Sequence, residues 1–204
     1  PELPEIEIVK RSLFKMVNKA KIINIKINNK KLRYKIPESF KKKLLNEKIL
    51  NISRRSKYII FHFKKKLLLA HMGMTGKFLI LRVKDNTVFK TSFYYNLNII
   101  AKHNHLYFFL NNGLVLIYND IRRFGFLKIY ENQKLEEITF LKKLGREPFS
   151  NNFDIRYFKN FIKNKKKNIK SMLMDQTFVS GLGNIYVNEV LFKSQIHPLR
   201  ISGG

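Results

Sequence analysis

The sequence predicts an α+β protein, in which one helix and a series of strands precede a helical carboxy-terminal part. Apolar residues recur at helical spacing after residue 4, short alternating segments with tight turns fill residues 49–130, and helical spacing returns after residue 153. We divide the chain accordingly into an amino-terminal β-rich domain over residues 1–130, a linker over residues 131–152 and a helical domain over residues 153–204.

The amino-terminal elements follow from the spacing of their apolar residues. A helix is predicted from Pro4 to about residue 18, because apolar side chains repeat along one of its faces. Isoleucines then alternate with polar residues over 23–27 and predict a strand. A second, short helix is predicted over residues 38–48, with a lysine-rich exposed face.

The β-rich part is predicted from short alternating segments and one strong turn. Strands are predicted over residues 58–63, 67–71, 77–82, 105–110, 114–118 and 126–130. Asn112-Gly113 predicts a two-residue hairpin, because both of its turn positions favour positive φ. Residues 84–104 are predicted to be a polar loop region. Many short strands joined by tight turns are typical of a β-sandwich or barrel.

The helical part is predicted from spacing and from a glycine-containing turn. Helices are predicted over residues 154–163, 169–175 and 184–194. Residues 176–183 contain two glycines and predict a tight turn between the last two helices. Glycines ahead of a helix let backbone amides approach a phosphate, which the positive end of the helix dipole attracts.

The composition favours a polyanionic partner. Lysine and arginine number 41 against 14 acidic residues, which gives a net charge of +27, and such a charge neutralises phosphates. This balance does not separate DNA from RNA or from an anionic membrane. No apolar run approaches the ~18 residues that span a bilayer, and no signal peptide opens the chain. We therefore expect a soluble, intracellular protein. The absence of cysteine excludes disulfides, thiolate metal sites and cysteine nucleophiles.

Pro1 is a candidate nucleophile, because a proline at residue 1 carries a free secondary amine. An α-amino group titrates near pH ~7.7–8.0, so a sizeable fraction is unprotonated at neutral pH. Its attack on an aldehyde-like sugar carbon would give an iminium, and the adjacent Glu2 can supply or remove a proton. The alternative is that Pro1 only remains after removal of an initiator methionine, and that Pro4 begins a helix.

Five stretches of the sequence, in this order, resemble those of the bacterial formamidopyrimidine-DNA glycosylases, which remove oxidised purines from DNA. They are residues 1–7, 54–58, 71–76, 120–125 and 181–186. The resemblance runs from Pro1 to about Pro198. It implies a β-sandwich with a packed amino-terminal helix, followed by a helix-two-turn-helix domain that is truncated here. The four-cysteine zinc finger of the family is absent, so we expect no metal site and no cofactor.

The resemblance implies a catalytic role for three residues. Pro1 corresponds to the nucleophile that attacks C1′ of the deoxyribose, and Glu2 to its acid/base partner. Lys57 corresponds to a proton donor in the subsequent elimination. Without the resemblance, Lys57 is an exposed lysine at the start of a strand.

Three further residues match those that act on the duplex in the family. Met74 and Phe124 correspond to side chains that enter the duplex, and Arg122 to the arginine that faces the orphaned base. Apolar wedges replace lost stacking, and arginine offers donors to a base edge. This trio, together with Leu3, favours the formamidopyrimidine branch over the related endonuclease VIII branch. Ile121 departs from the proline that the family usually has at this position.

Contacts with the DNA backbone are implied for His71, His103, Lys166 and Asn184. Phosphate contacts of this kind position a protein without reading the base sequence. Taken singly, the two histidines would more often be structural residues.

The resemblance thus predicts a DNA glycosylase and AP lyase of base-excision repair. It would remove 8-oxoguanine and formamidopyrimidines through a Schiff base at Pro1, followed by β- and δ-elimination. The expected partner is double-stranded DNA with oxidised bases or abasic sites, and we expect a monomer in the bacterial cytoplasm, associated with the nucleoid. Three alternatives remain: a catalytically impaired DNA-binding remnant, an endonuclease VIII-like glycosylase for oxidised pyrimidines, and a general basic RNA-binding protein.

Overall fold

The computed structural model describes residues 1–91 and 100–203 and separates into two compact units. The first unit comprises Pro1 and residues 3–133, and the second comprises Glu2 and residues 134–204. Residues 92–99, which belong to the predicted polar loop, lie outside the described part of the chain. No helix in the described part is long and apolar enough to cross a bilayer.

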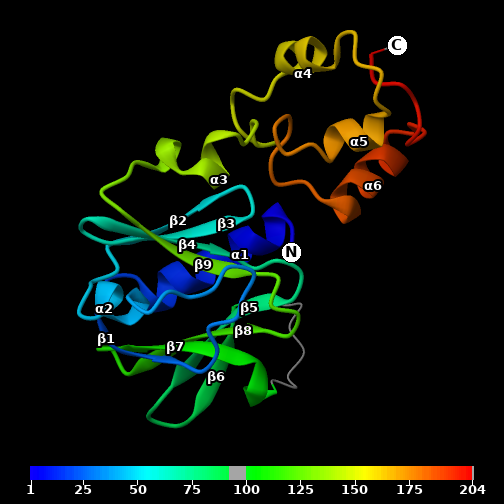
Figure 1. Cartoon of the computed structure of the whole chain (residues 1–204). Helices are drawn as coiled ribbons and strands as arrows, with labels where there is room; N and C mark the ends of the chain where they lie inside the picture. The colour runs from blue at the N-terminus through cyan, green and yellow to red at the C-terminus, as the bar shows by residue number, and fades with distance from the viewer. Residues whose placement is uncertain (92–99, 204) are drawn as a thin grey trace. The chain divides into compact units, whose positions relative to one another are not determined.

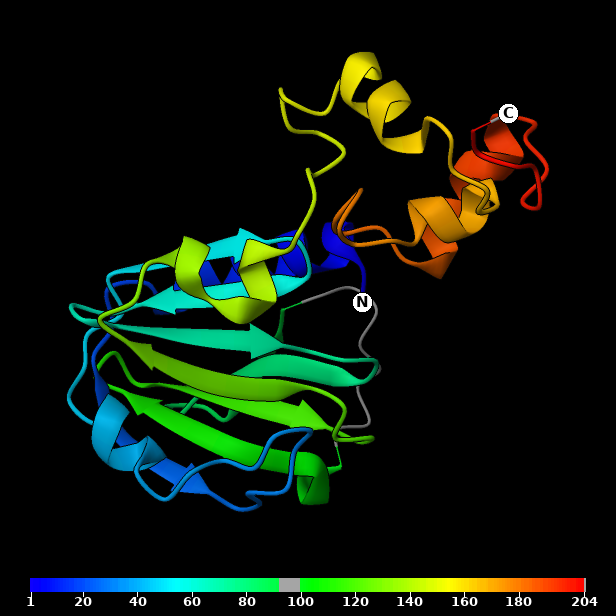
Figure 2. The ribbon, with the colours of Figure 1, turned by 45° about the horizontal axis from the view of Figure 1, so that its top comes forward.

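The first unit is built around two antiparallel sheets (Figure 1). The five-stranded sheet has the order β1 (Ile22–Ile27), β7 (Asn104–Leu110), β8 (Leu114–Asp120), β5 (Gly76–Arg82) and β6 (Thr87–Lys90). The four-stranded sheet has the order β2 (Asn51–Arg55), β3 (Tyr58–His62), β4 (Lys66–His71) and β9 (Phe126–Glu131). The two sheets form separate layers (Figure 2), which confirms the predicted β-sandwich.

The core of the first unit lies between these sheets and extends to the helices. Phe61 of β3 meets Phe78 of β5 edge to face, with 5.7 Å between ring centroids. The helix α1 (Leu3–Val17) buries the apolar side chains that predicted it, and the short helix α2 (Phe40–Leu44) buries Phe40 and Leu44. The amino-terminal helix is therefore packed on the sandwich, as the sequence predicts.

A carboxylate network fixes the exposed side of α1. Glu7 accepts hydrogen bonds from Arg54 Nε at 2.8 Å and Arg11 Nε at 2.9 Å, and its Oε1 lies 2.9 Å from Lys10 Nζ. Burial alone would raise the pKa of the Glu7 carboxyl, but the hydrogen bonds from Arg54, Lys10 and Arg11 lower it to about 2. Glu7 is therefore charged over the whole neutral range.

Two features of the first unit differ from the sequence predictions. Ile23 is 51% exposed instead of lying on the buried face of its strand, because a register shift between Ile22 and Asn24 in β1 reverses the alternation. The predicted loop 84–104 contains β6 and a 3-10 turn, η1 (Ala101–His103).

The second unit consists of short helices around a small aromatic core. Its elements are η2 (Leu135–Glu137), α3 (Thr139–Lys142), α4 (Ile155–Ile162), α5 (Ile169–Leu173) and α6 (Asn184–Lys193). The first two lie in the segment predicted to be a linker. At the centre, the fully buried Phe178 ring stacks on Phe161, with 4.2 Å between centroids. Asp154 and Asn168 cap α4 and α5 by accepting a hydrogen bond from the backbone N–H of the third residue of each helix.

Candidate functional site

Two loops of the first unit bring together the residues predicted to enter a duplex. Met74 lies between β4 and β5, and Arg122 and Phe124 lie between β8 and β9. Arg122 Nη1 is 3.2 Å from the Met74 sulfur, and its guanidinium carbon is 4.6 Å from the Phe124 ring centroid. Met74 is 63% exposed and Phe124 46%. The three side chains form one exposed group, which we call the wedge.

The backbone of these loops allows the close approach. Gly73 has a φ of +55°, and a Cβ at this position would lie 2.6 Å from the carbonyl carbon of Phe124. Arg123 has a φ of +57°, although it is not glycine, and a non-glycine residue in this region is strained. The second loop therefore turns sharply between Arg122 and Phe124.

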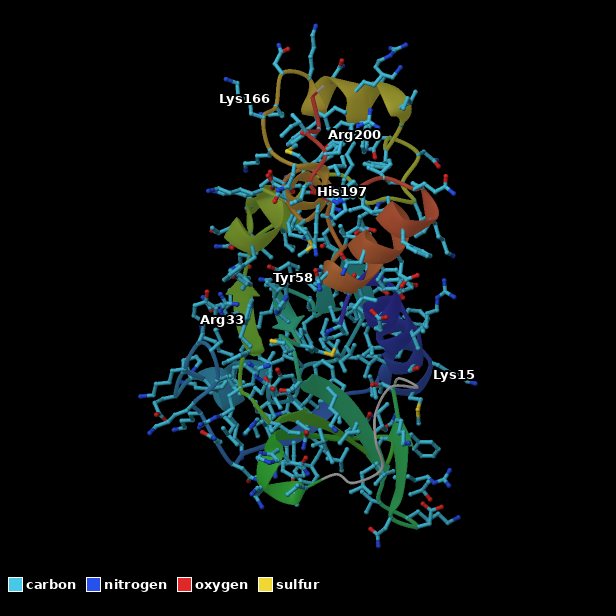
Figure 3. All side chains as sticks on the ribbon, turned by 90° about the vertical axis from the view of Figure 1, so that its right-hand side faces the viewer. Lys15, Arg33, Tyr58, Lys166, His197 and Arg200 are labelled. Carbon is cyan, nitrogen blue, oxygen red and sulfur yellow. The ribbon has the colours of Figure 1, made fainter. Side chains whose placement is uncertain are left out.

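His71, Lys57 and the amino terminus share one neighbourhood at one end of the strands of the four-stranded sheet. The His71 ring stacks on Phe126 with centroids 5.6 Å apart and lies 4.9 Å from the Tyr58 ring. Burial, acting together with the nearby positive charges of Arg33, Lys57 and the amino terminus, lowers the pKa of His71 to about 4. The charges of these three groups thus disfavour protonation of the imidazole. Figure 3 labels Arg33 and Tyr58 in this region.

The hydrogen bonding of His71 defines which ring nitrogen carries its proton. Nδ1 of His71 accepts a hydrogen bond from the backbone N–H of Gly73 at 3.1 Å. A neutral imidazole that accepts at Nδ1 carries its hydrogen on Nε2. At neutral pH, His71 can therefore contact a phosphate only as a neutral donor.

Glu2 belongs to the second unit, where its carboxylate meets the start of α6. It accepts hydrogen bonds from the backbone N–H groups of Gly183 at 2.7 Å, Ile185 at 2.8 Å and Tyr186 at 3.3 Å. A negative charge is favourable at a helix amino terminus. A Cβ on Gly183 would lie 2.5 Å from Glu2 Cδ, so only glycine fits here without displacing the carboxylate. The position of residue 2 is therefore tightly specified.

The Gln176 side chain fixes the turn before α6 through two hydrogen bonds to the turn's backbone. Its Oε1 accepts from the N–H of Gly181 at 2.9 Å, and its Nε2 donates to the carbonyl of Leu182 at 2.8 Å. Gly181 has a φ of +102°, which favours glycine. The predicted tight turn is confirmed, whereas the role of Gln176 was not predicted.

The remaining predicted contacts lie on different elements. His103 ends η1 in the first unit and is partly exposed. In the second unit, Lys166 is exposed on the loop between α4 and α5 (Figure 3), and Asn184 is the exposed first residue of α6. These two residues belong to the second unit, and the wedge belongs to the first.

Sequence reasoning missed the residues that support the site. Asp120 and Thr75 are the main examples, because Asp120 is fully buried beneath the wedge loops and Thr75 contacts it. The signal available was an acidic residue at the end of a strand whose neighbours are apolar, since a buried carboxylate requires partners.

A zinc site of the kind that the resemblance implies has no ligands in this chain. The sequence contains no cysteine. Within residues 1–91 and 100–203, no group of three histidine, aspartate or glutamate side chains is arranged to hold a metal ion.

Family models match both units of the chain. The model described as the formamidopyrimidine-DNA glycosylase N-terminal domain matches residues 1–127, and the model of the H2TH domain of the same enzyme matches residues 144–203. The formamidopyrimidine-DNA glycosylase of Bartonella tribocorum is 42% identical over 205 residues, which cover 98% of this chain and 69% of that relative. The Lactobacillus gasseri enzyme is 40% identical over 200 residues, covering 98% of this chain and 68% of the relative.

Solved structures of the Lactococcus lactis Fpg (MutM) are similar to this fold. Its complex with DNA that contains an oxidised pyrimidine has a TM-score of 0.85 at 35% identity and covers 100% of this chain and 71% of that one. Its complex with abasic-site DNA has a TM-score of 0.83 at 34% identity, with coverages of 100% and 70%. Because sequence, domain models and fold agree along both units, the chain belongs to the formamidopyrimidine-DNA glycosylase family, the DNA glycosylases of base-excision repair.

Proposed function

We propose that this chain removes oxidised purines, namely 8-oxoguanine and formamidopyrimidines, from double-stranded DNA and then cleaves the abasic site. The observation that carries this proposal is the wedge, in which Met74, Arg122 and Phe124 are exposed side by side. A glycosylase takes its target base out of the stack before it reaches the sugar. Apolar side chains then fill the gap, and Arg122 offers donors to the cytosine that has lost its partner.

The proposed chemistry begins at the secondary amine of Pro1. Its nitrogen lone pair forms a bond to C1′ of the deoxyribose while the bond from C1′ to the base breaks, and the base leaves with a proton. Glu2 is the proposed acid/base that moves protons during this exchange and the opening of the sugar ring. Loss of the proton from the Pro1 nitrogen leaves a neutral aminal at C1′. The nitrogen lone pair then expels O4′, which takes up a proton as the sugar ring opens, and the product is the iminium, which is the Schiff base.

Strand cleavage follows from the same iminium. Removal of a proton from C2′ allows the 3′ phosphate to leave in β-elimination, and a second elimination releases the 5′ phosphate. Lys57 is the proposed proton donor in these steps, because it matches the family lysine with that role. Its charge also acts on His71, which supports a place close to the amino terminus.

The proposed DNA contacts combine charged and neutral donors. Lys166 and Asn184 would bind phosphates from the second unit, and His103 and His71 from the first. His71 would do so through Nε2–H without a charge. With a net charge of +27, we propose that the chain acts as a monomer on bacterial chromosomal DNA in the cytoplasm, with an affinity that falls steeply with salt.

A second candidate substrate is an oxidised pyrimidine. One of the Lactococcus lactis complexes similar to this fold contains DNA with an oxidised pyrimidine. A duplex with an oxidised pyrimidine therefore belongs beside 8-oxoguanine in any test of substrate range.

The test is covalent trapping with borohydride, which reduces an iminium to a stable bond. The protein is mixed with a duplex carrying 8-oxoguanine opposite cytosine, and a second sample contains an abasic-site duplex. We expect a protein–DNA band on both duplexes that is lost in Pro1→Gly and kept in Pro4→Ala, a matched proline change that leaves the terminal amine intact. A folded protein that forms no band on either duplex would favour the non-catalytic DNA-binding remnant.

A further inference from the structure

One buried carboxylate joins the two loops that carry the wedge. Asp120 ends β8 and is fully buried. Its Oδ1 accepts a hydrogen bond from Thr75 Oγ1 at 2.5 Å, and its Oδ2 accepts from the backbone N–H of Gly125 at 2.9 Å. Thr75 follows Met74, and Gly125 follows Phe124. A single side chain thus contacts the residue next to each apolar member of the wedge.

Thr75 extends this connection to the arginine. Its hydroxyl, which donates to Asp120, also accepts a hydrogen bond from the backbone N–H of Arg122 at 2.9 Å. The loop after β8 is therefore held at both ends, at Arg122 through Thr75 and at Gly125 directly. Between these points lies Arg123 with its positive φ.

The carboxylate is itself fixed by the five-stranded sheet. The Asp120 backbone pairs with Gly76 of β5, and its carbonyl is 2.7 Å from Nε2 of the buried His105. The Tyr118 hydroxyl lies 3.3 Å from Asp120 Oδ2. A Cβ on Gly125 would lie 1.9 Å from that hydroxyl, so glycine is required for the loop to reach the carboxylate. Groups held in this way on a rigid sheet position a site more accurately than loops alone.

We infer that Asp120, acting through Thr75, is a positioning residue that holds Met74, Arg122 and Phe124 as one unit for insertion into DNA. Asp120 does not touch DNA, because no part of it is exposed. This role rests on the proposed function, since it concerns the step in which the base is extruded. It separates extrusion from the chemistry at Pro1.

The variants are chosen to break the connection without emptying the core. Thr75→Val has nearly the same shape but loses the hydroxyl, so the Arg122 N–H and Asp120 Oδ1 both lose a partner. Thr75→Ser keeps the hydroxyl and is the rescue variant. Asp120→Asn is the second disruption, because an amide cannot accept hydrogen bonds at both of its outer atoms. Asp85→Asn, at an exposed aspartate, is its matched control.

The first measurement compares two substrates at saturating DNA. Excision of 8-oxoguanine requires extrusion, whereas borohydride trapping on an abasic-site duplex removes no base. For Thr75→Val and Asp120→Asn we expect excision to fall on the order of tenfold or more, because small misplacements of positioning groups have effects of this size. Trapping on abasic DNA should change less than about twofold, and Thr75→Ser should restore excision. An equal loss on both substrates, or none, overturns the inference.

The second measurement needs no catalysis and so separates this inference from the proposed function. A duplex with an uncleavable tetrahydrofuran abasic analogue carries 2-aminopurine beside it, and wedge insertion unstacks that base and raises its fluorescence. We expect the rise with the unaltered protein and with Thr75→Ser, and its loss in Thr75→Val at equal occupancy of the DNA. A rise that is equal in Thr75→Val overturns the inference, and so does binding of the unaltered protein without a rise. Loss of the Pro1 band alone contradicts only the proposed chemistry.

Discussion

Both units use polar side chains to fix the turns that carry candidate site residues, but the apolar cores that support these turns differ in size. In the first unit, Asp120 extends from a strand of a sandwich with a large apolar core and holds two loops at once. In the second, Gln176 holds the turn and Glu2 accepts three backbone hydrogen bonds at α6, next to a small core around Phe178. The second unit buries much less apolar surface than the first. A single substitution therefore removes a larger share of its stability.

The largest expected effect is the loss of the Phe178 ring. Removing a fully buried phenylalanine costs about 3–5 kcal/mol, and this core is much smaller than the core of the first unit. We expect Phe178→Ala to unfold residues 154–194 while the sandwich stays folded, as measured by hydrogen exchange with mass spectrometry. Phe192→Ala is the matched control, because that ring is 82% exposed. Retained protection in Phe178→Ala would contradict the contrast between the two units.

The next effect is the pH dependence from His71 in the first unit. The folded pKa of about 4 lies below the unfolded value of ~6.5, so only the unfolded chain binds a proton between them. The contribution of the neutral His71 to the free energy of unfolding is fully present above pH ~6.5 and is lost as the pH falls towards 4. This contribution is at most about 3 kcal/mol. We expect the melting temperature of His71→Gln to vary less with pH between about 4 and 6.5 than that of the unaltered protein.

His62→Gln is the matched control for this prediction. Burial also lowers the pKa of His62, which accounts for part of the slope. An identical flattening by the two variants would show that the positive groups around His71 have no additional effect.

A smaller structural effect is expected at the start of α6. In Gly183→Ala the new methyl group meets the end of the flexible Glu2 side chain, which moves away. The φ of −131° suits alanine, so the cost comes from displacing the Glu2 carboxylate from the first N–H groups of α6, and we expect about 1–2 kcal/mol of destabilisation. Activity should fall about tenfold, since a catalytic group is misplaced. Gly113→Ala is the control, because it introduces a positive-φ strain with nothing within 4 Å of the new atom. Full activity of Gly183→Ala would separate Glu2 from catalysis.

The smallest effect concerns Glu7 on α1. Its folded pKa of about 2 lies below the unfolded value of ~4.3. The stabilisation is present above that unfolded value and is lost as the pH falls through 2. We expect Glu7→Gln to lower stability at pH 7 by about 1 kcal/mol and to have only a small effect near pH 2, by calorimetry. Glu38→Gln, in an exposed ion pair with Lys30, should change stability less at either pH.

Periodicity predicted most of the elements because most of them bury one regular face. The helix α1, the hairpin at Asn112-Gly113 and the helices α4, α5 and α6 are found within a few residues of their predicted positions. Ile23 was placed on the wrong face, because a bulge breaks the period of two. The helical turns within residues 131–152 are too short to give a repeat.

The site was predictable only where its residues are exposed and form recognisable motifs. The sequence identified Met74, Arg122 and Phe124, and the structure brings them together. It did not identify Asp120 or Thr75, because their role depends on hydrogen bonds between residues 45 positions apart. Contacts of that range leave no periodic signal in a single sequence.

Arg123 has a consequence for how this loop tolerates change. Its side chain is exposed and its charge suits DNA, so randomising this codon would be expected to select for basic residues. Its φ of +57° imposes a different filter. Glycine and asparagine enter the left-handed region readily, whereas valine and isoleucine do not. A pooled library selected for repair in cells should therefore retain uncharged glycine and asparagine here and lose the β-branched residues. Backbone geometry, rather than charge, would then decide which amino acids are tolerated at this position.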